Sequence, residues 1–480
     1  MQFNSRYSDL NDKLYHQQAP VPLKGAKAGH FNEAIADELQ WTSQEKQSWV
    51  EICSGQKIFD AFKSLAMVYA GHQFGQWAGQ LGDGRGLLIA QVLNRSGQTI
   101  DLHLKGAGLT PYSRMGDGRA VLRSVIREYL AGHALNALGV ASSNAIGFTT
   151  SEQGVQREKL EQGAMLLRTS DCHIRLGHFE WINQYSPELL KEFTQKCIEW
   201  HYPEVLEAEH PILAFVEGVI KNTAQMIAQW QLVGFAHGVM NTDNLNITGS
   251  TLDFGPYGFM ERFRPNWINN HSDHQGRYAY QNQPSIAHWN LWIWLNNLIP
   301  LAKPEDKETF KKQLADCLEH FEPTFLTAYT EGLCKKLGLP NFHKDSFDCG
   351  MAFLKVLQSE QLDYTQSFLR LQNHEYKALR DDCLDIRQFD DFLTLYHQIR
   401  EHQDIEQLDE QMKQVNPVYI LRNHMAQQAI EQAEHGDFSE VERLFSLLRQ
   451  PFIKQTDLER PEDLAPLPSD IPEVMVSCSS

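Results

Sequence analysis

The sequence lacks the long apolar runs that membrane helices need. No stretch approaches the roughly 20 consecutive apolar residues of a membrane-spanning helix. The N-terminal segment MQFNSRYSDLNDKLYHQQAP has no apolar stretch behind a basic start. We therefore expect no membrane partner, no export and a cytoplasmic location.

Closely spaced cysteines are also lacking. The chain has 8 cysteines without a CxxC pair, so neither a zinc knuckle nor a dense disulfide framework is supported. The spread of positions is typical of reduced, mostly structural thiols. Only Cys478, close to the C-terminus, is expected to be exposed.

Positive charge is scarce. The 43 Lys and Arg residues face 61 Asp and Glu residues, which gives a net charge of −18. This balance does not suit a protein that neutralises a phosphate backbone, so nucleic acid is not expected as a partner. With 480 residues, 42% of them hydrophobic, the chain is long and apolar enough for about two to four folded domains.

The order of local patterns predicts an α+β protein with two lobes and a tail. Residues 86–93 and 98–105 read as a hairpin, 119–139 as a helix that Asp117 caps, and 143–150 and 163–169 as further strands. Later segments have helical periodicity, near 211–235, 285–300, 305–335, 344–360, 375–400 and 420–448. We therefore expect a mixed α/β N-terminal lobe (1–185), a mainly helical lobe (186–450) and an extended Pro-rich tail (451–480).

A glycine-rich segment, GHQFGQWAGQLGDGRG (71–86), precedes the first strand of this hairpin. Closely spaced glycines let backbone amides approach phosphate oxygens, and Arg85 would add a positive fork. The segment has no GK[ST], and it enters a strand rather than a helix. It fits either a nucleotide-covering loop of the kinase type or an ordinary tight turn.

Lys105 on the predicted hairpin and Glu128 in the next helix form a second candidate. Protein kinases use a strand lysine on the nucleotide phosphates and a helix glutamate that holds it. The alternative is that Lys105 is an ordinary edge charge and that Glu128 pairs with Arg127 or His133 on a solvated face.

The segment HGVMNTDNLNITGSTLDFG (237–255) is the most specific pattern. His237 and Asn244 have the spacing of the kinase catalytic loop HRDxxxxN, and Asp253 begins a DFG triplet. Val239 stands where that loop has its catalytic base, and an aliphatic side chain accepts no proton. A carboxylate is present instead at Asp243, directly before Asn244.

Two arginines stand near the end of the first lobe: Arg168 at the end of its last predicted strand, and Arg175 shortly after it. In an ordinary kinase this stretch leads to the hinge that meets adenine, where arginines have no obvious use. They indicate either an anion site in an unusual place or structural salt bridges.

Together these motifs resemble the SelO family, the YdiU-type pseudokinases. The resemblance rests on YAGHQFG, QLGDGRG, DLHLKGAG, HGVMNTDN, LDFGPYGF, NHSDHQGRY and the terminal CSS, and it spans nearly the whole chain. It implies a bilobal, protein-kinase-like α+β fold that binds ATP in a flipped orientation. It also implies transfer of AMP to Ser, Thr or Tyr hydroxyls of proteins with release of pyrophosphate, and UMP transfer with manganese for bacterial members.

The resemblance also assigns roles to residues. Asp243 becomes the catalytic base, Asn244 and Asp253 would hold Mg²⁺ or Mn²⁺, and Glu128 would support Lys105. The nucleotide contacts implied are Gly82, Gly84, Arg85, Lys105, Asp117, Gly118, Arg168, Arg175 and Asp253.

Two other functions stay open. Ordinary transfer of the γ-phosphoryl group suits Lys105, Glu128, Asn244 and Asp253 but must explain Val239. A nucleotide-binding scaffold without catalysis explains Val239 but leaves the two metal ligands without a use. A regulatory disulfide of Cys478 has no identified partner, because Asn269 and Asn270 stand where one would be sought.

Overall fold

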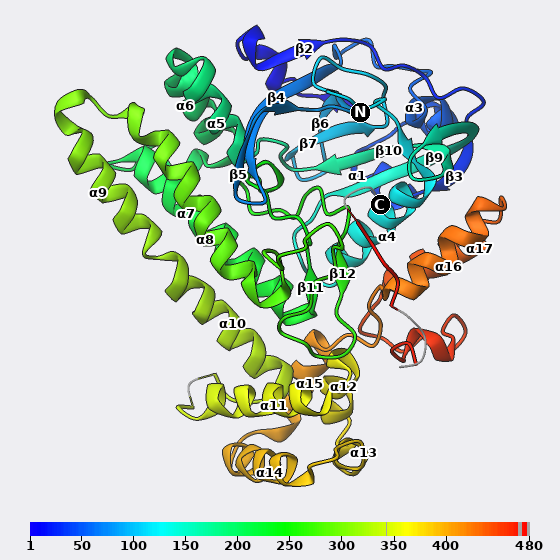
Figure 1. The fold of residues 1–480 in the computed structure, drawn as a ribbon, viewed down its shortest axis with the longest axis vertical. Helices are drawn as coiled ribbons and strands as arrows, with labels where there is room; N and C mark the ends of the chain where they lie inside the picture. Colours follow the sequence, from blue (N-terminus) through cyan, green and yellow to red (C-terminus); the bar gives the residue numbers. More distant parts are fainter. Residues whose placement is uncertain (342, 469–472, 478–480) are drawn as a thin grey trace.

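The computed structural model describes residues 1–341, 343–468 and 473–477. Cys478 lies outside the described residues. The fold is mixed α+β: an antiparallel sheet forms the N-terminal part, and the rest of the chain is mostly helical, as the sequence predicts (Figure 1). Among the described residues, no helix has both the length and the apolar character needed to cross a bilayer.

Ten strands make up the sheet, with the central order β2-β4-β6-β7-β10-β9-β3. The predicted hairpin is confirmed as β6 and β7, and the two later strands as β9 and β10. The strands are β1 (Gln2–Phe3), β2 (Tyr15–Gln17), β3 (Lys27–Phe31), β4 (Leu65–Gln73), β5 (Gln76–Gly82), β6 (Gly86–Leu93), β7 (Thr99–Lys105), β8 (Ala120–Val121), β9 (Asn144–Gln156) and β10 (Leu160–Ser170).

The polar face of β7 is turned inward. β7 lies between β6 and β10, so it is not an edge strand. Asp101, His103 and Lys105 are therefore buried, each with a polar partner. Burial of charged residues in a central strand requires such pairing.

Four helices belong to the sheet part: α1 (Glu33–Glu38), α2 (Ser43–Gln47), α3 (Trp49–Cys53) and α4 (Leu122–Ala137). The predicted helix at 119–139 is confirmed as α4, but the cap assigned to Asp117 is wrong. Val121 precedes the helix and makes no side-chain cap bond. Asp117 instead pairs with Arg157, and β8 separates it from the helix by pairing with β10.

In the helical part, three predicted helices are split in two, and four further helices have no counterpart among the predicted stretches. Its members are α5 (Leu176–Tyr185), α6 (Leu190–His201), α7 (Pro211–Val233), α8 (Gln283–Leu298), α9 (Lys307–Leu318), α10 (Phe321–Leu337), α11 (Ser346–Glu360), α12 (Tyr364–Gln372), α13 (Tyr376–Asp381), α14 (Ile386–Arg400), α15 (Ile405–Val415), α16 (Asn423–Glu434) and α17 (Ser439–Leu448). The stretches 305–335, 375–400 and 420–448 were each predicted as one helix. Gly436, with φ of +86°, shows why the last one breaks: its left-handed backbone ends a helix.

Two segments near the C-terminus contact earlier parts of the fold: helices α16 and α17 contact the sheet part, and the tail contacts the loop around Asn270. Helices α16 and α17 pack on α4, where the rings of His133 and Phe445 stack at 3.8 Å (Figure 1). In the tail, Val476 pairs with Asn270, and its carbonyl accepts the N–H of His271 at 2.9 Å. The segment that follows the DFG triplet is thus held partly by the C-terminal tail.

Candidate functional site

A cleft of about 600 Å³ separates the sheet from the helical part, and the predicted site residues line it. β5 to β7, β10 and α4 contribute from one side, and the segment 239–256 contributes from the other. Two short strands that pair with each other, β11 (Phe235–Ala236) and β12 (Gly258–Phe259), flank this segment in the sequence. The predicted residues that line it are Gly82, Gly84, Arg85, Lys105, Asp117, Gly118, Glu128, Arg168, Arg175, Asp243, Asn244 and Asp253.

Glycine is required where the loops approach one another. Gly118 has φ of +72°, and a Cβ there would lie 2.1 Å from the carbonyl carbon of Gly108. Gly82 has φ of +147°, and its Cβ would meet the ring of Tyr112 at 2.5 Å. Side chains at these positions would push the neighbouring loops of the sheet part apart.

Lys105 and Glu128 form a buried ion pair, which contradicts the surface alternative for both residues. Glu128 also accepts a hydrogen bond from Arg168 Nε at 2.6 Å. Burial opposes ionisation of Glu128, but the charges of Arg168 and Lys105 lower its pKa to about 2. Neither Arg127 nor His133 pairs with it: they bond to the carbonyls of Tyr257 and Phe445.

Asp253 joins the two arginines. Its Oδ1 lies 2.9 Å from Arg168 Nη1, and its Oδ2 lies 2.6 Å from Arg175 Nη2. Burial opposes ionisation, yet these two cations hold the pKa of Asp253 well below its usual range. The arginines are buried, 3% and 2% exposed, so the interior of the cleft is cationic rather than apolar.

Asp83 belongs to the site but was not singled out in the sequence. Its carboxylate lies 3.3 Å from His103 Nε2 and 3.9 Å from Arg175 Nη1, and it accepts the N–H of Met67 at 3.0 Å. Although burial opposes ionisation, His103 and Arg175 lower the pKa of Asp83 to about 2. The signal available in the sequence was the position of Asp83 between two glycines in GDGR. A turn alone does not require a carboxylate, and acidic side chains are rarely buried without a partner.

Asp243 faces the cleft from a short 3-10 turn, Thr242–Asn244. Gln73 Nε2 donates to its Oδ2 at 3.1 Å, whereas Oδ1 has no hydrogen-bond partner among the described residues. Burial raises the pKa of Asp243 to about 7. Val239 lines the same cleft without a polar side chain.

Asn244 and Asp253 offer a donor set that fits a hard divalent cation. The side-chain NH₂ of Asn244 donates to the Val239 carbonyl at 2.9 Å, which leaves its amide oxygen as the ligand atom. Amide and carboxylate oxygens suit Mg²⁺ and Mn²⁺. The described residues contain no group of three His, Cys, Asp or Glu side chains that would hold a metal alone. Phosphate and water oxygens would have to complete the shell, as is usual for Mg²⁺ with nucleotides.

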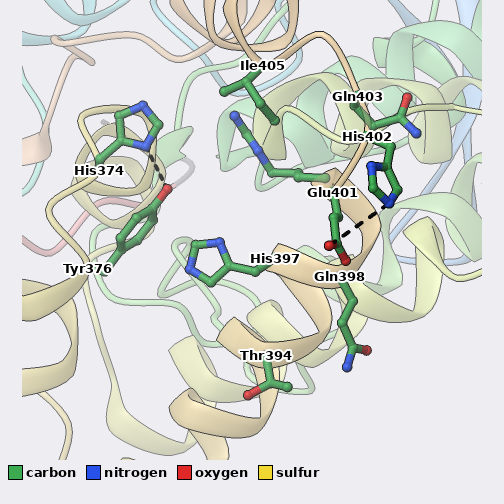
Figure 2. Close-up of a pocket in the computed structure, with 10 residues that line it drawn as sticks. His374, Tyr376, Thr394, His397, Gln398, Glu401, His402, Gln403 and Ile405 are labelled. Carbon is green, nitrogen blue, oxygen red and sulfur yellow. Dashed lines mark hydrogen bonds and ion pairs between the residues drawn. The ribbon is translucent and has the colours of Figure 1, made fainter.

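A hollow of about 740 Å³ at the far end of the helical part is larger but collects none of these residues (Figure 2). His374, whose ring points toward Tyr376 in this view, is fully engaged. Its two ring nitrogens lie 2.6 Å from Tyr376 OH and 2.8 Å from Asp409 Oδ2. The chemistry suggested by the sequence therefore lies in the cleft.

The cleft thus brings together a buried lysine–glutamate pair, two buried arginines, and the side-chain oxygens of Asn244 and Asp253. Residues 1–449 match the family model described as "Protein adenylyltransferase SelO". The chain belongs to this family of protein nucleotidyltransferases, as its motifs indicated.

Relatives match over the full length. The protein nucleotidyltransferase YdiU of Yersinia pseudotuberculosis (serotype O:1b, strain IP 31758) is 42% identical over 491 residues, which cover 100% of this chain and 99% of the relative. Proteins of the same name from Pectobacterium atrosepticum and Vibrio parahaemolyticus are also 42% identical, over 490 and 493 residues, with 100% of this chain and 99% and 98% of the relatives covered.

Proposed function

We propose that this enzyme transfers AMP from ATP to Ser, Thr or Tyr hydroxyls of protein substrates and releases pyrophosphate. The observation that carries the proposal is the cationic interior of the cleft, where Arg168 and Arg175 are buried against Asp253. An adenine ring needs an apolar slot, whereas the β- and γ-phosphates need such guanidinium groups. A nucleotide with its phosphates inward presents its α-phosphorus toward the acceptor.

The chain's own residues provide for the proton transfer and for part of the charge stabilisation. The acceptor hydroxyl oxygen attacks the α-phosphorus, a new O–P bond forms, and the bond from the α-phosphorus to the bridging oxygen breaks. The hydroxyl proton passes to Asp243, and the electron pair leaves with pyrophosphate, whose charge Arg168, Arg175 and Lys105 neutralise. Glu128 orients Lys105 and Arg168 through its two carboxylate oxygens.

Asn244 and Asp253 would hold Mg²⁺ or Mn²⁺. When bound, the ion neutralises phosphate charge and polarises the phosphoryl oxygens. A bilobal, kinase-like arrangement with the nucleotide reversed is part of this proposal, as are UTP as a second co-substrate and a cytoplasmic location, where ATP is available.

The test offers the enzyme a protein extract with ATP labelled at either the α- or the γ-position. We expect α-label on protein and pyrophosphate as the product. Arg168→Ala and Arg175→Ala should each lower α-label incorporation by about 10²-fold. Arg387→Ala is the matched control, because this side chain is 86% exposed and pairs only with Asp385 in the structure.

Two outcomes would replace the proposal. Transfer of γ-label with ADP as the product would restore the kinase alternative, in which Val239 is unexplained. Binding of nucleotide without transfer of either label would favour the scaffold.

A further inference from the structure

The hairpin of β4 and β5 places an aromatic side chain at the edge of the cleft in an unfavourable backbone conformation. Gln73 pairs with Gln76, so the turn consists of Phe74 and Gly75, with φ of +51° and +80°. Asn-Gly is the usual pair in a turn with two positive φ values, and a phenylalanine there is strained. The N–H of Phe74 donates to Tyr278 OH at 2.9 Å and to Asn241 Oδ1 at 3.2 Å. These bonds hold Phe74, 38% exposed, against the cleft it lines.

Arg277 is fixed directly behind this turn. A Cβ on Gly75 would lie 2.9 Å from Arg277 Cζ, and the guanidinium carbon lies 4.6 Å from the centre of the Trp289 ring. Its loop is held by Asp273, whose carboxylate accepts the N–H groups of Arg277 at 3.0 Å and Tyr278 at 2.7 Å. The guanidinium is thus sandwiched between the hairpin and α8, and little conformational freedom remains to be lost on binding.

This fixed cation has no anionic partner in the described part of the chain. Arg277 takes part in none of the ion pairs among the described residues, although the chain has 61 acidic and 43 basic residues. Nε and Nη2 also have no hydrogen-bond partner there. By contrast, Arg157 at the opposite rim pairs with Asp117. Nη1 is not among these buried atoms, and Arg277 as a whole is half-buried, so an anion that arrives with a ligand could pair with the guanidinium there.

Arg277 is not among the residues that line the cleft with Arg168 and Arg175. It lies instead on the side of Asp243. Gln73 bonds to Asp243, and Gly75, two residues along the same turn, contacts Arg277. An extended peptide advances about 3.3–3.6 Å per residue. Since the residue that bonds to Asp243 and the residue that contacts Arg277 are two positions apart, we expect a side chain about two positions from a hydroxyl at Asp243 to reach Arg277.

We propose that Arg277 is a specificity-determining residue that selects acceptor segments with an Asp or Glu near the modified hydroxyl. Phe74, beside it, supplies an apolar surface for the same segment. This inference rests on the proposed protein nucleotidyl transfer and names the class of acceptor that the site takes. Its chemistry is a charge-assisted hydrogen bond between a fixed guanidinium and a carboxylate.

The experiment uses the full-length enzyme and synthetic peptides with one hydroxyl residue, Ser, Thr or Tyr, flanked at two positions by Glu, Gln or Lys. Incorporation of α-labelled AMP and binding of the same fluorescent peptides are both measured, the latter with a non-cleavable ATP analogue present. We expect the wild type to favour Glu over Lys peptides by about tenfold or more in both assays. Arg277→Gln should remove the preference, and Arg277→Glu should reverse it.

Arg277→Lys, which keeps the charge, should retain part of the preference, and Arg387→Glu, the same charge reversal at a distant exposed site, should retain all of it. Unchanged affinity for the ATP analogue shows that the variants are folded. Equal use and binding of Glu and Lys peptides by the wild type would overturn the inference, as would an Arg277→Glu enzyme that still favours Glu. If no peptide is labelled but the binding preference follows Arg277, the proposed transfer fails while the acceptor surface stands.

Discussion

Asp243 has its two carboxylate oxygens in unlike surroundings. Oδ2 accepts a hydrogen bond from Gln73, whereas Oδ1 has no partner among the residues that the structure describes. Gly71 leaves the room for Oδ1, since a Cβ at that position would lie 2.6 Å from it. A buried carboxylate with one unsatisfied oxygen is unfavourable for folding and suited to receive a hydrogen bond from a substrate.

Replacing Asp243 with Asn tests its assignment as the base, because the side chain keeps its shape and loses its ability to take a proton. We expect the rate of α-label transfer to fall by about 10²-fold or more, with little change in affinity for ATP. Rate and affinity are measured separately, by single-turnover labelling and by calorimetry. A variant that transfers AMP at the wild-type rate would exclude Asp243 as the base.

Local spacing predicted some residues of the cleft and not others. Lys105, Glu128 and Asp253 were identified because short motifs fix their places in a strand, a helix and a loop. The ion pair of Arg175 with Asp253 joins residues far apart in the sequence, so whether the arginine serves an anion or a salt bridge was open. The bond of Arg157 to Asp117 likewise comes from tertiary packing, and it made the predicted cap wrong.

At the scale of elements, periodicity predicted β6, β7, β9, β10, α4 and most of the later helices, but not the strands β1 to β5 or the helices α5, α6, α12 and α15. It also joined helices that are separate, such as α9 with α10, and α16 with α17, where Gly436 has a positive φ. The polar alternation of β7 was visible in the sequence, but its burial between β6 and β10 was not. Alternation alone does not distinguish a solvated face from a polar interior.

A buried lysine in α10, Lys336, is a second polar group in the interior. Its burial leads us to expect that the stability of the protein depends on pH. Lys336, 3% exposed, has its Nζ 4.4 Å from the ring centre of Phe368 on α12. Burial lowers its pKa from 10.5 to about 7. Between these two values the unfolded chain binds the proton and the folded chain does not, so stability from this group rises with pH across that window.

Lys336→Met should therefore stabilise the protein at pH 7, by on the order of 2–4 kcal/mol in the free energy of unfolding. The gain should shrink as the pH rises from 7 toward 10.5, the pKa of the unfolded chain's lysine, and disappear above it, where the wild-type lysine is neutral in both states. Denaturant unfolding of both proteins across this range measures the difference. Lys335→Met, at the exposed neighbouring position, is the control and should show no such trend. A gain that does not vary with pH would contradict the assignment.

At the scale of the whole molecule, the cleft combines residues from parts that are distant in sequence. Lys105, Arg168 and Glu128 come from the sheet part, and Asn244 and Asp253 come from the helical part. The net charge of −18 contrasts with the cations inside the cleft. A ligand that contacts both sides should therefore stabilise the two parts together.

Nucleotide and metal should bind cooperatively, because both depend on the same carboxylate. In the structure, Asp253 is occupied on both oxygens by Arg168 and Arg175, so a cation arriving alone meets two positive charges. Phosphates draw the arginines to themselves and free Asp253 for the metal. We expect Mn²⁺ alone to shift the melting temperature little, and Mn²⁺ with a non-cleavable ATP analogue to raise it by ~2–5 °C more than the analogue alone.

The variant Asp253→Asn tests this cooperativity. In this variant, Mn²⁺ together with the analogue should raise the melting temperature no more than the analogue alone does. Paramagnetic resonance of free Mn²⁺ gives an independent measure of metal binding, which should tighten about tenfold or more when the analogue is present. Equal Mn²⁺ affinity with and without the analogue would show that the arginine pairs do not compete with the metal. In that case Asp253 would only pair with Arg168 and Arg175, and a different oxygen donor would have to bind the ion.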